Sequence, residues 1–231
     1  MTATKTKLMK TVKNIRQEFV DLYSNQATVK HSNGDEMFEI IAASFLADEE
    51  TIFASVNQDY VEAEIEWYTN QSTNINDIYK GKKEPPKAWQ LAADKHGNIN
   101  SNYGHLIFSH KYAQQYNQVI NELNSNKYSR RASMIYTRPS IWNEYNESGK
   151  SDFICTNAVT YYQRENTLHC VVQMRSNDVI YGYRNDRAWQ KYVLNELCND
   201  LLLDPGNIFW QVQNLHIYPK HFQHIDKYLN Q

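Results

Sequence analysis

Residues 152–178 have the sequence DFICTNAVTYYQRENTLHCVVQMRSND, in which two runs rich in β-branched and aromatic residues flank a short polar segment. Such runs around a polar turn are typical of a β-hairpin. We therefore predict strands at 152–162 and 168–174, joined by a turn at 164–167. The first strand contains a single cysteine, Cys155, and a charged stretch at 175–178 follows the second.

The segments on either side of this hairpin add further strands and helices. Residues 38–46 form an apolar run of strand length, and apolar residues alternate in 207–218. Apolar residues recur at helical spacing in 59–70, 111–124 and 188–203. Because strands and helices follow one another without a regular βαβ rhythm, the sequence predicts an α+β fold.

Composition excludes several classes of protein. The 231 residues include 24 Lys and Arg against 26 Asp and Glu, a formal net charge of −2, so we expect no DNA binding. No apolar run approaches the roughly 20 residues of a membrane span, and no apolar segment follows the basic N-terminus, so we expect neither a membrane segment nor a secretory signal. The 3 widely spaced cysteines are typical of a reducing compartment. We predict a single domain over 1–231, located in the cytoplasm.

Glu64 is the first candidate for chemistry. It lies three residues after Val61 and four before Tyr68, so it projects from the apolar stripe of its predicted helix. A carboxylate among apolar side chains has a raised pKa and suits proton transfer near neutral pH. Alternatively, the helix face is wider than this spacing indicates, and Glu64 lies at its solvent edge.

The predicted strand at 207–218 becomes polar at its end. A period of two places Asn214, His216 and Tyr218 on the face that apolar residues occupy earlier in the strand. This pattern fits a strand that enters a pocket, and equally one that emerges into water. His216, His221 and His224 have no recognised ligand spacing, so we expect no metal.

Cys155 is either an inert buried side chain or a nucleophile. A nucleophilic cysteine needs a cationic neighbour that lowers its pKa. Arg175 and the pair Arg130-Arg131 are candidates. Adjacent arginines can be a solvated surface pair, or they can bind an anion, because the guanidinium group matches phosphate oxygens.

These residues together resemble the thymidylate synthase family over about residues 38–221. The resemblance rests on seven motifs in the family's order and at closely matching spacings: Glu64-Ile-Glu-Trp67 with Thr73-Asn74-Ile75, Trp89, Tyr103-Gly104, Arg130-Arg131, Cys155, Arg175-Ser-Asn-Asp178 with Gly182, and His216-Ile-Tyr218 with His221. One such motif is weak evidence, whereas seven in register are strong evidence.

Two departures from the family pattern point to a particular branch. Thymidylate synthases have Pro-Cys-His around the nucleophile, whereas this chain has Ile154 and Thr156 there. The family's pyrimidine-reading asparagine, four residues after the glycine, is Asp186 here. A carboxylate accepts from the amino group of cytosine and opposes O4 of uracil, so Asp186 favours cytosine. With the segments 43–48, 135–140 and 188–193, this makes the chain most similar to phage deoxycytidylate (dCMP) 5-hydroxymethyltransferases.

The resemblance implies a thymidylate synthase-like fold, in which a large twisted mixed sheet with flanking helices packs against its copy in a homodimer. It implies transfer of a one-carbon unit from 5,10-methylenetetrahydrofolate to C5 of dCMP with addition of water. The roles that it implies are a nucleophile, a proton-transfer carboxylate, phosphate, sugar and base contacts, and folate contacts. The nucleophile falls on Cys155, the proton-transfer carboxylate on Glu64, and the phosphate contacts on Arg175, Ser176 and a second subunit's Arg130 and Arg131. The sugar contacts fall on His216 and Tyr218, and the base contact on Asp186, with Tyr103 as a further substrate contact. The folate contacts fall on Trp89 and Asp178.

Three alternatives stay open at this point. A dCMP 5-methyltransferase or a CMP 5-hydroxymethyltransferase would share these residues. A catalytically silent nucleotide- or RNA-binding relative is a third possibility, against which the joint presence of Cys155, Glu64 and Arg175 argues. Few residues follow His221, so we expect a wetter site, which fits capture of the one-carbon unit by water rather than hydride.

Overall fold

The computed structural model describes residues 9–31 and 34–230. Residues 1–8, part of the N-terminus in which we expect no secretory signal, lie outside the described residues. The strands are β1 (Lys10–Thr11), β2 (Val29–Lys30), β3 (Glu36–Leu46), β4 (Ser133–Ile135), β5 (Thr156–Arg164), β6 (Thr167–Asp178) and β7 (Asp204–Ile217). The α-helices are α1 (Val12–Ser24), α2 (Gln58–Thr69), α3 (Lys87–Ala92), α4 (Tyr103–Phe108), α5 (Gln115–Ser125), α6 (Ile141–Glu144), α7 (Gly182–Leu201) and α8 (Gln223–Leu229), and short 3₁₀ turns lie at Ile75–Asp77, His110–Tyr112, Glu147–Gly149 and Pro219–His221.

The strands form one mixed sheet in the order β1-β3-β7-β6-β5-β4, with β2 paired to β3. β6 and β7 are parallel, and α7 connects them. The pairs β3–β7, β5–β6 and β4–β5 are antiparallel. The predicted hairpin is therefore present as β5 and β6, and the predicted α+β class is confirmed.

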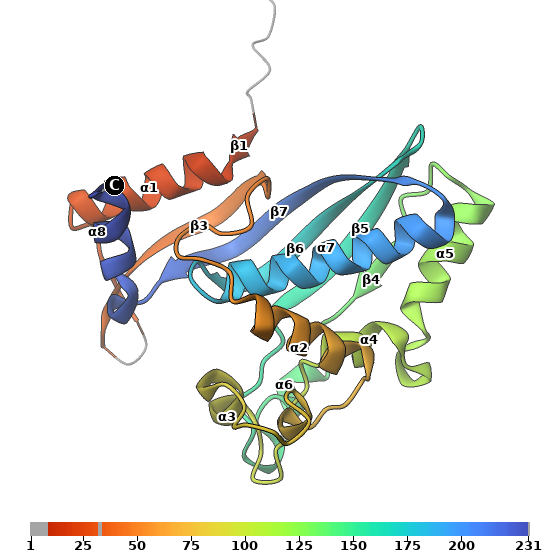
Figure 1. The fold of residues 1–231 in the computed structure, drawn as a ribbon, viewed down its shortest axis with the longest axis horizontal. Coiled ribbons are helices and arrows are strands. Elements are labelled where there is room, and N and C mark those ends of the chain that lie inside the picture. The colour runs from red at the N-terminus through yellow and green to blue at the C-terminus, as the bar shows by residue number, and fades with distance from the viewer. Residues whose placement is uncertain (1–8, 32–33, 231) are drawn as a thin grey trace, which may run out of the picture.

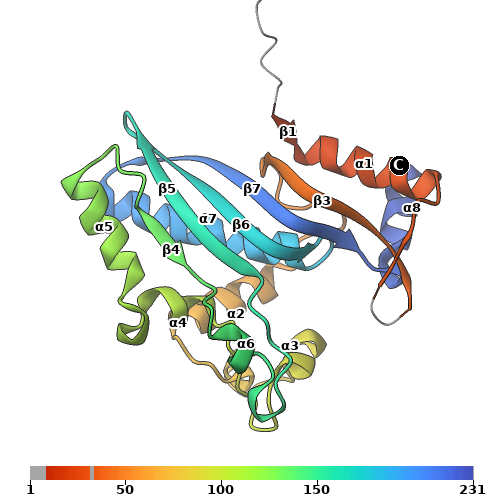
Figure 2. The ribbon, with the colours of Figure 1, turned by 180° about the vertical axis from the view of Figure 1, so that it is seen from behind.

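The helices lie mainly on one face of the sheet. Figure 1 shows α7 running across the sheet, with α2 and α4 below it. The first and last helices, α1 and α8, lie side by side next to β3. Apolar side chains of α7, among them Trp189, Val193 and Leu197, are buried against the strands. Figure 2 shows the opposite face, where among the described residues no helix covers β5, β6 and β7.

Several predicted boundaries differ from the observed ones, for local reasons. The helix predicted at 111–124 begins only at Gln115, because Ala113 and Gln114 have left-handed φ values of 65° and 46°. The helix predicted at 188–203 begins earlier, at Gly182, because the Asp178 carboxylate accepts the backbone N–H groups that open it. Residues 152–155, predicted as strand, precede β5 and are held instead by isolated backbone bonds and by bonds to the Asp152 side chain.

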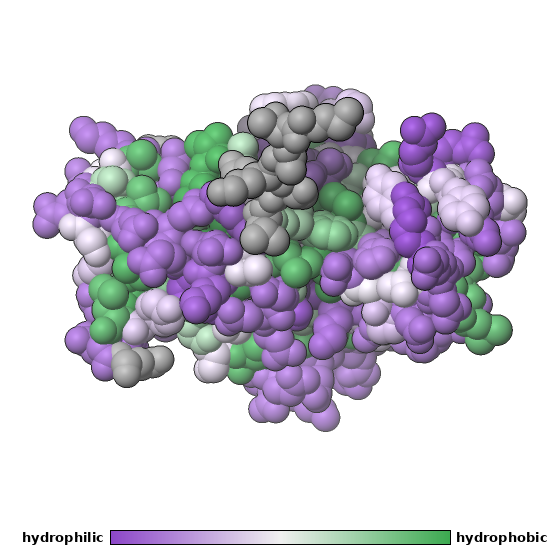
Figure 3. Space-filling model, turned by 90° about the horizontal axis from the view of Figure 1, so that it is seen from above, coloured by the Kyte–Doolittle hydropathy of each residue, from purple (hydrophilic) through white to green (hydrophobic). Residues whose placement is uncertain are grey.

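The surface is mixed in character. Figure 3 views the molecule from above, where hydrophobic residues lie in separate groups among hydrophilic ones. Among the described residues, no helix combines the length and the apolar character that crossing a membrane requires.

Candidate active site

α2 carries Glu64 on its buried face. Asn57 caps the helix, since its side chain accepts the backbone N–H of Tyr60 at 3.1 Å. Glu64 is 6% exposed and shares the buried face with Val61, Trp67 and Tyr68, as the sequence spacing predicts. The alternative of a solvent-edge position is therefore wrong.

Two aromatic side chains hold the Glu64 carboxylate. The Tyr60 hydroxyl donates to its Oε1, and Trp89 Nε1 donates to the Tyr60 oxygen at 2.8 Å and lies 3.3 Å from the same Oε1. Burial raises the pKa of Glu64 to about 7, although the bonds from Tyr60 and Trp89 lower it. Glu64 is consequently able to exchange a proton near neutral pH.

Cys155 lies just before β5, next to an irregularity in the strand pairing. The register between β5 and β6 shifts between Thr156 and Ala158, and the backbone N–H of Arg175 donates to the Cys155 carbonyl at 2.8 Å. The Arg175 guanidinium Nη2 lies 3.7 Å from Cys155 Sγ and donates to the Phe153 carbonyl at 3.1 Å. The thiol and a cation are thus neighbours, as predicted.

Burial strongly affects the acidity of Cys155. Although the residue keeps partial exposure, desolvation raises the pKa of the thiol to about 12, and the nearby Arg175 opposes this rise. Asp186 and Asp152 add to it. In the single chain, desolvation and the carboxylate charges outweigh the one neighbouring guanidinium, and a thiolate held by several arginines stays a prediction.

Asp186 lies in the first turns of α7 and is half-buried. Asn177 at the end of β6 donates from Nδ2 to Asp186 Oδ2 at 2.7 Å. Burial and the neighbouring Glu64 carboxylate raise the pKa of Asp186, whereas the bond from Asn177 lowers it. The site therefore contains two interacting carboxylates, Glu64 and Asp186, from different helices.

β6 and β7 place their polar ends side by side. Ser176 pairs with Asn214 and Asp178 with His216 in the parallel ladder. His216 Nδ1 lies 3.0 Å from Asn214 Oδ1, and the His216 ring is packed edge to face against Tyr218 at 4.8 Å. This strand end enters the site, so the alternative of a strand that emerges into water is wrong.

Asp178 also has a structural task. Its Oδ1 accepts the backbone N–H groups of Ile180 and Tyr181 at 2.8 and 2.9 Å, and its Oδ2 accepts that of Gly182 at 2.7 Å. These bonds satisfy the free N–H groups at the start of α7. A folate contact by Asp178 stays a prediction.

Tyr103 is fixed by close packing of α4 against α2. A Cβ on Gly104 would lie 1.7 Å from the Tyr68 carbonyl oxygen, so only glycine permits this approach. Tyr103 is buried and stacks on Tyr68 with ring centroids 5.3 Å apart. Burial raises the pKa of Tyr103, and the groups of Asp186 and Cys155 add to this rise.

Arg130 and Arg131 are the predicted site residues that the single chain does not bring to the others. They lie in the loop between α5 and β4, and Arg131 is 80% exposed on its side chain and paired with Glu122 at 3.1 Å. α5 contacts the C-terminal end of α7, where Tyr116 donates to Asp200 at 2.8 Å. Figure 1 shows this loop at the opposite end of α7 from its first turns.

Known proteins similar to this chain identify its family. Residues 52–231 match the family model described as thymidylate synthase. The chain belongs to the thymidylate synthase family. It is 44% identical over 227 residues to the deoxycytidylate 5-hydroxymethyltransferase of Enterobacteria phage T2, with 95% of this chain and 91% of the relative covered. The enzyme of the same name from phage T6 is 46% identical over 223 residues, covering 94% and 89%.

Two further relatives place the chain within this thymidylate synthase family. The thymidylate synthase of Fusobacterium nucleatum is 32% identical over 147 residues, covering 62% of this chain and 51% of the relative. The crystal structure of thymidylate synthase from T4 phage superposes with a TM-score of 0.76 at 17% identity, covering 95% of this chain and 81% of that one. The predicted thymidylate synthase-like fold is confirmed.

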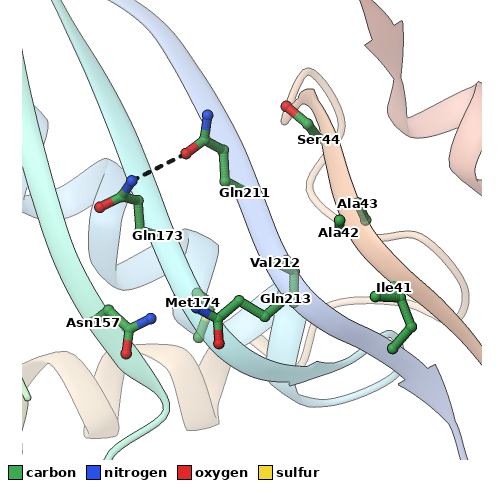
Figure 4. A pocket seen from close by; sticks show the side chains of 10 residues that line it. All are labelled: Ile41, Ala42, Ala43, Ser44, Asn157, Gln173, Met174, Gln211, Val212 and Gln213. Atoms are coloured by element: carbon green, nitrogen blue, oxygen red, sulfur yellow. Dashed lines mark hydrogen bonds between the residues drawn. The ribbon is translucent and has the colours of Figure 1, made fainter.

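The face of the sheet that no described helix covers contains a depression. A depression of about 530 Å³ lies over β3, β7, β6 and β5. Figure 4 shows its polar floor, where Gln173 donates to Gln211 at 3.2 Å, with Asn157 and Gln213 nearby. Ile41 at its edge is 64% exposed. This face is available to pack against another molecule.

Sequence reasoning missed three residues that support the site. Tyr60 holds Glu64, and Asn177 holds Asp186. Asp152 accepts from the backbone N–H of Ser101 at 2.8 Å and from that of Asn100, and so ties the segment before Cys155 to the loop before α4. The spacing of four between Tyr60 and Glu64 was the one available signal. Among the described residues, no group of His, Cys, Asp and Glu could hold a metal ion.

Proposed function

We propose that this chain transfers a one-carbon unit from 5,10-methylenetetrahydrofolate to C5 of dCMP with addition of water, which gives 5-hydroxymethyl-dCMP and tetrahydrofolate. The observation that carries the proposal is Asp186, a half-buried carboxylate at the family's pyrimidine-reading position, held by Asn177 at 2.7 Å. The identity of 44% to the named phage T2 enzyme over 95% of the chain supports it.

Asp186 would read the base. Cytosine presents an amino donor at position 4 and an acceptor at N3, so an ionised Asp186 accepts from the amine, and a protonated N3 adds a second donor. Uracil instead presents O4 to the same carboxylate, and two acceptors repel.

Cys155 would attack C6 of the base. The sulfur forms a bond to C6, the electron pair moves to C5, and C5 becomes able to bond to the one-carbon unit. Since desolvation raises the pKa of the thiol to about 12, the attack requires a proton acceptor or more positive charge beside the sulfur. Arg175 supplies part of this charge at 3.7 Å.

The residues around Glu64 fit a folate and a water molecule. Trp89 is half-buried and packs edge to face on Trp67 with ring centroids 5.3 Å apart, so its exposed surface next to Glu64 can stack on a pterin ring. When bound, the folate supplies a carbon at the oxidation level of formaldehyde. Once C5 has lost its proton and carries an exocyclic methylene, Glu64, with a pKa of about 7, can accept the proton of the water that adds to that methylene. The electron pair that moves to C5 then expels the Cys155 sulfur from C6, which restores the C5–C6 double bond and releases the product.

The phosphate end would be completed by a second copy of the chain. Arg175 lies beside Cys155, and its guanidinium Nε has no hydrogen-bond partner among the described residues, so its capacity to donate is not used up within the chain. Arg130 and Arg131 lie far from it in the same chain, and the open hollowed sheet face favours packing against a copy. We infer a homodimer in which Arg130 and Arg131 of one subunit reach the phosphate site of the other. The single domain and the cytoplasmic location stay predictions.

Mass spectrometry of the nucleotide product tests the function. The protein is incubated with methylenetetrahydrofolate and, in parallel, dCMP, CMP or dUMP. A gain of CH₂O on dCMP alone is the expected result. A gain of CH₂ would identify a methyltransferase, modification of CMP would identify a ribonucleotide enzyme, and unchanged nucleotides from folded protein would favour a silent relative.

A further inference from the structure

Asn177 and Trp210 form a buried connection behind Asp186. Trp210 of β7 is fully buried, and its Nε1 donates to Asn177 Oδ1 at 3.3 Å. Asn177 of β6 is 3% exposed, and its Nδ2 donates to Asp186 Oδ2 of α7 at 2.7 Å. Two consecutive hydrogen bonds therefore connect β7, β6 and α7.

The indole N–H fixes which way the Asn177 amide points. An indole nitrogen is a donor only, so the amide must turn its oxygen toward Trp210 and its NH₂ group toward Asp186. If the amide turned over, its oxygen would face the Asp186 carboxylate and its NH₂ group would face the indole N–H. Both contacts would then be repulsive, so only one orientation satisfies the groups on both sides.

The backbone of α7 leaves room for this amide. A Cβ on Gly182 would lie 2.8 Å from Asn177 Nδ2 and 2.9 Å from Asp178 Oδ2. Gly182 is one turn before Asp186, so the missing side chain opens the space through which Asn177 reaches the carboxylate. A larger residue at 182 would displace the Asn177 amide from Asp186.

One carboxylate oxygen stays available for the base. Among residues 9–31 and 34–230, Asp186 Oδ1 receives no hydrogen bond, while Oδ2 is engaged by Asn177. A carboxylate with one oxygen anchored cannot rotate freely, so its second oxygen keeps a fixed direction toward the substrate. Preorganised acceptors of this kind discriminate between donors and acceptors on a ligand more strongly than mobile ones.

We propose that Asn177, oriented by Trp210, is a positioning residue that sets the preference of Asp186 for cytosine over uracil. This inference rests on the proposed function, because it concerns how the same site reads its nucleotide. Asn177 itself touches no reacting atom. It acts by anchoring Oδ2 and by stabilising the ionised carboxylate, the form that accepts from the cytosine amine and repels uracil O4.

The ratio of dCMP to dUMP affinity, measured by competition or calorimetry, tests the proposal. Asn177→Leu keeps the side-chain size and removes the donor, so we expect the ratio to fall by about 10- to 100-fold, the effect of a hydrogen bond to a charged group. A structural defect would lower the affinity for both nucleotides in proportion and leave the ratio of the two affinities unchanged. Folding is checked by circular dichroism.

Trp210→Phe provides a milder second variant, which keeps an aromatic ring in the core and removes only the N–H and part of the ring. We expect the ratio to fall by about 3- to 10-fold, because the amide loses its fixed orientation. Trp189→Phe is the matched control, since Trp189 of α7 is equally buried and makes no bond to Asn177. The control should keep the wild-type ratio.

Each outcome decides the matter. A wild-type ratio in folded Asn177→Leu, or equal ratios in Trp210→Phe and Trp189→Phe, would overturn the role of Asn177. If Asn177→Leu does not fold, the comparison of the two tryptophan variants still decides. The proposed function is tested by a different result: it is wrong if the wild-type protein does not hydroxymethylate dCMP.

Discussion

The two ends of the site are built in different ways. At the base end, Glu64, Asp186 and their supporting residues come together within one chain, and each carboxylate accepts a hydrogen bond from a neighbouring side chain. At the phosphate end, Arg175 has a buried Nε without a partner among the described residues, and the other predicted arginines lie at the far end of α7. In the proposed site, a single chain thus forms the base end, whereas the phosphate end would draw on a second chain.

This difference separates selectivity from binding strength. In the proposed site, the choice of base depends on short hydrogen bonds among neutral and charged groups of one chain. The strength of phosphate binding would depend on the number of guanidinium groups that reach the phosphate, which a second copy would increase. Variants at the two ends should therefore fail in different ways.

The largest change in selectivity is expected from Asp186→Asn at the base end. The amide of the new residue can donate to O4 of uracil, while Asn177 can still donate to its oxygen. We expect the dCMP to dUMP selectivity in kcat/KM to change by roughly 10³-fold toward dUMP. Steady-state kinetics with both nucleotides measure this, and an unchanged ratio would remove Asp186 from base recognition.

Mixed subunits test the phosphate end. Arg131→Ala and Cys155→Ala chains should each be nearly inactive alone. If sites are shared, a mixed dimer contains one site with both residues intact, so random 1:1 mixing should restore about one quarter of wild-type activity. The control mixes Cys155→Ala with the double variant Cys155→Ala/Arg131→Ala. Activity that stays at background in dimers shown to be mixed would contradict shared sites.

Glu64→Gln should raise stability while abolishing turnover. The pKa of Glu64 is about 7 in the fold against 4.5 in an ordinary setting, so between these pH values the unfolded chain binds fewer protons. Stability therefore falls as the pH rises from about 4.5 to about 7 and stays lower above it. Because glutamine does not ionise, the variant avoids this loss. We expect its free energy of unfolding to exceed that of the wild type by roughly 1–3 kcal/mol at pH 8, and the difference to disappear at pH 4. Thermal unfolding at both pH values measures it.

Tyr60→Phe should give the smallest change. The hydroxyl bond lowers the pKa of Glu64, so its loss should raise that pKa further above 7. We expect the rising limb of kcat against pH to move to higher pH and kcat at pH 7 to fall about 3- to 10-fold. Because phenylalanine keeps the aromatic ring, the variant should unfold at nearly the wild-type temperature, and this measurement is the control. A pH profile that matches the wild type would show that Tyr60 does not tune Glu64.

The sequence predicted those parts of the site that depend on periodicity. Helical spacing placed Glu64 on a buried face, and alternation placed His216 at a strand end that enters the site. The start of α7 was missed because residues 182–187 are mostly polar and carry no apolar period. That turn depends on Asp178, whose capping bonds become visible only in three dimensions.

Other features could not be predicted because they depend on contacts between distant segments. The role of Tyr60 requires Trp89, 29 residues further along the chain. The orientation of Asn177 requires Trp210, 33 residues away. The high pKa of Cys155 reflects desolvation by several elements at once, whereas the sequence revealed only its cationic neighbours. The roles of the site residues and the extent of the domain stay predictions.

The register shift beside Cys155 affects how the chain tolerates changes in length. The extra residue between Thr156 and Ala158 separates the β5 ladder from the segment that carries the sulfur, and the backbone bond from Arg175 holds that segment independently. Insertions at the 165–166 turn should therefore leave the nucleophile in place. Deletion of Asn157 would instead draw Cys155 along the strand by about 3.3 Å, the rise of one residue, which is far enough to take the sulfur out of reach of C6.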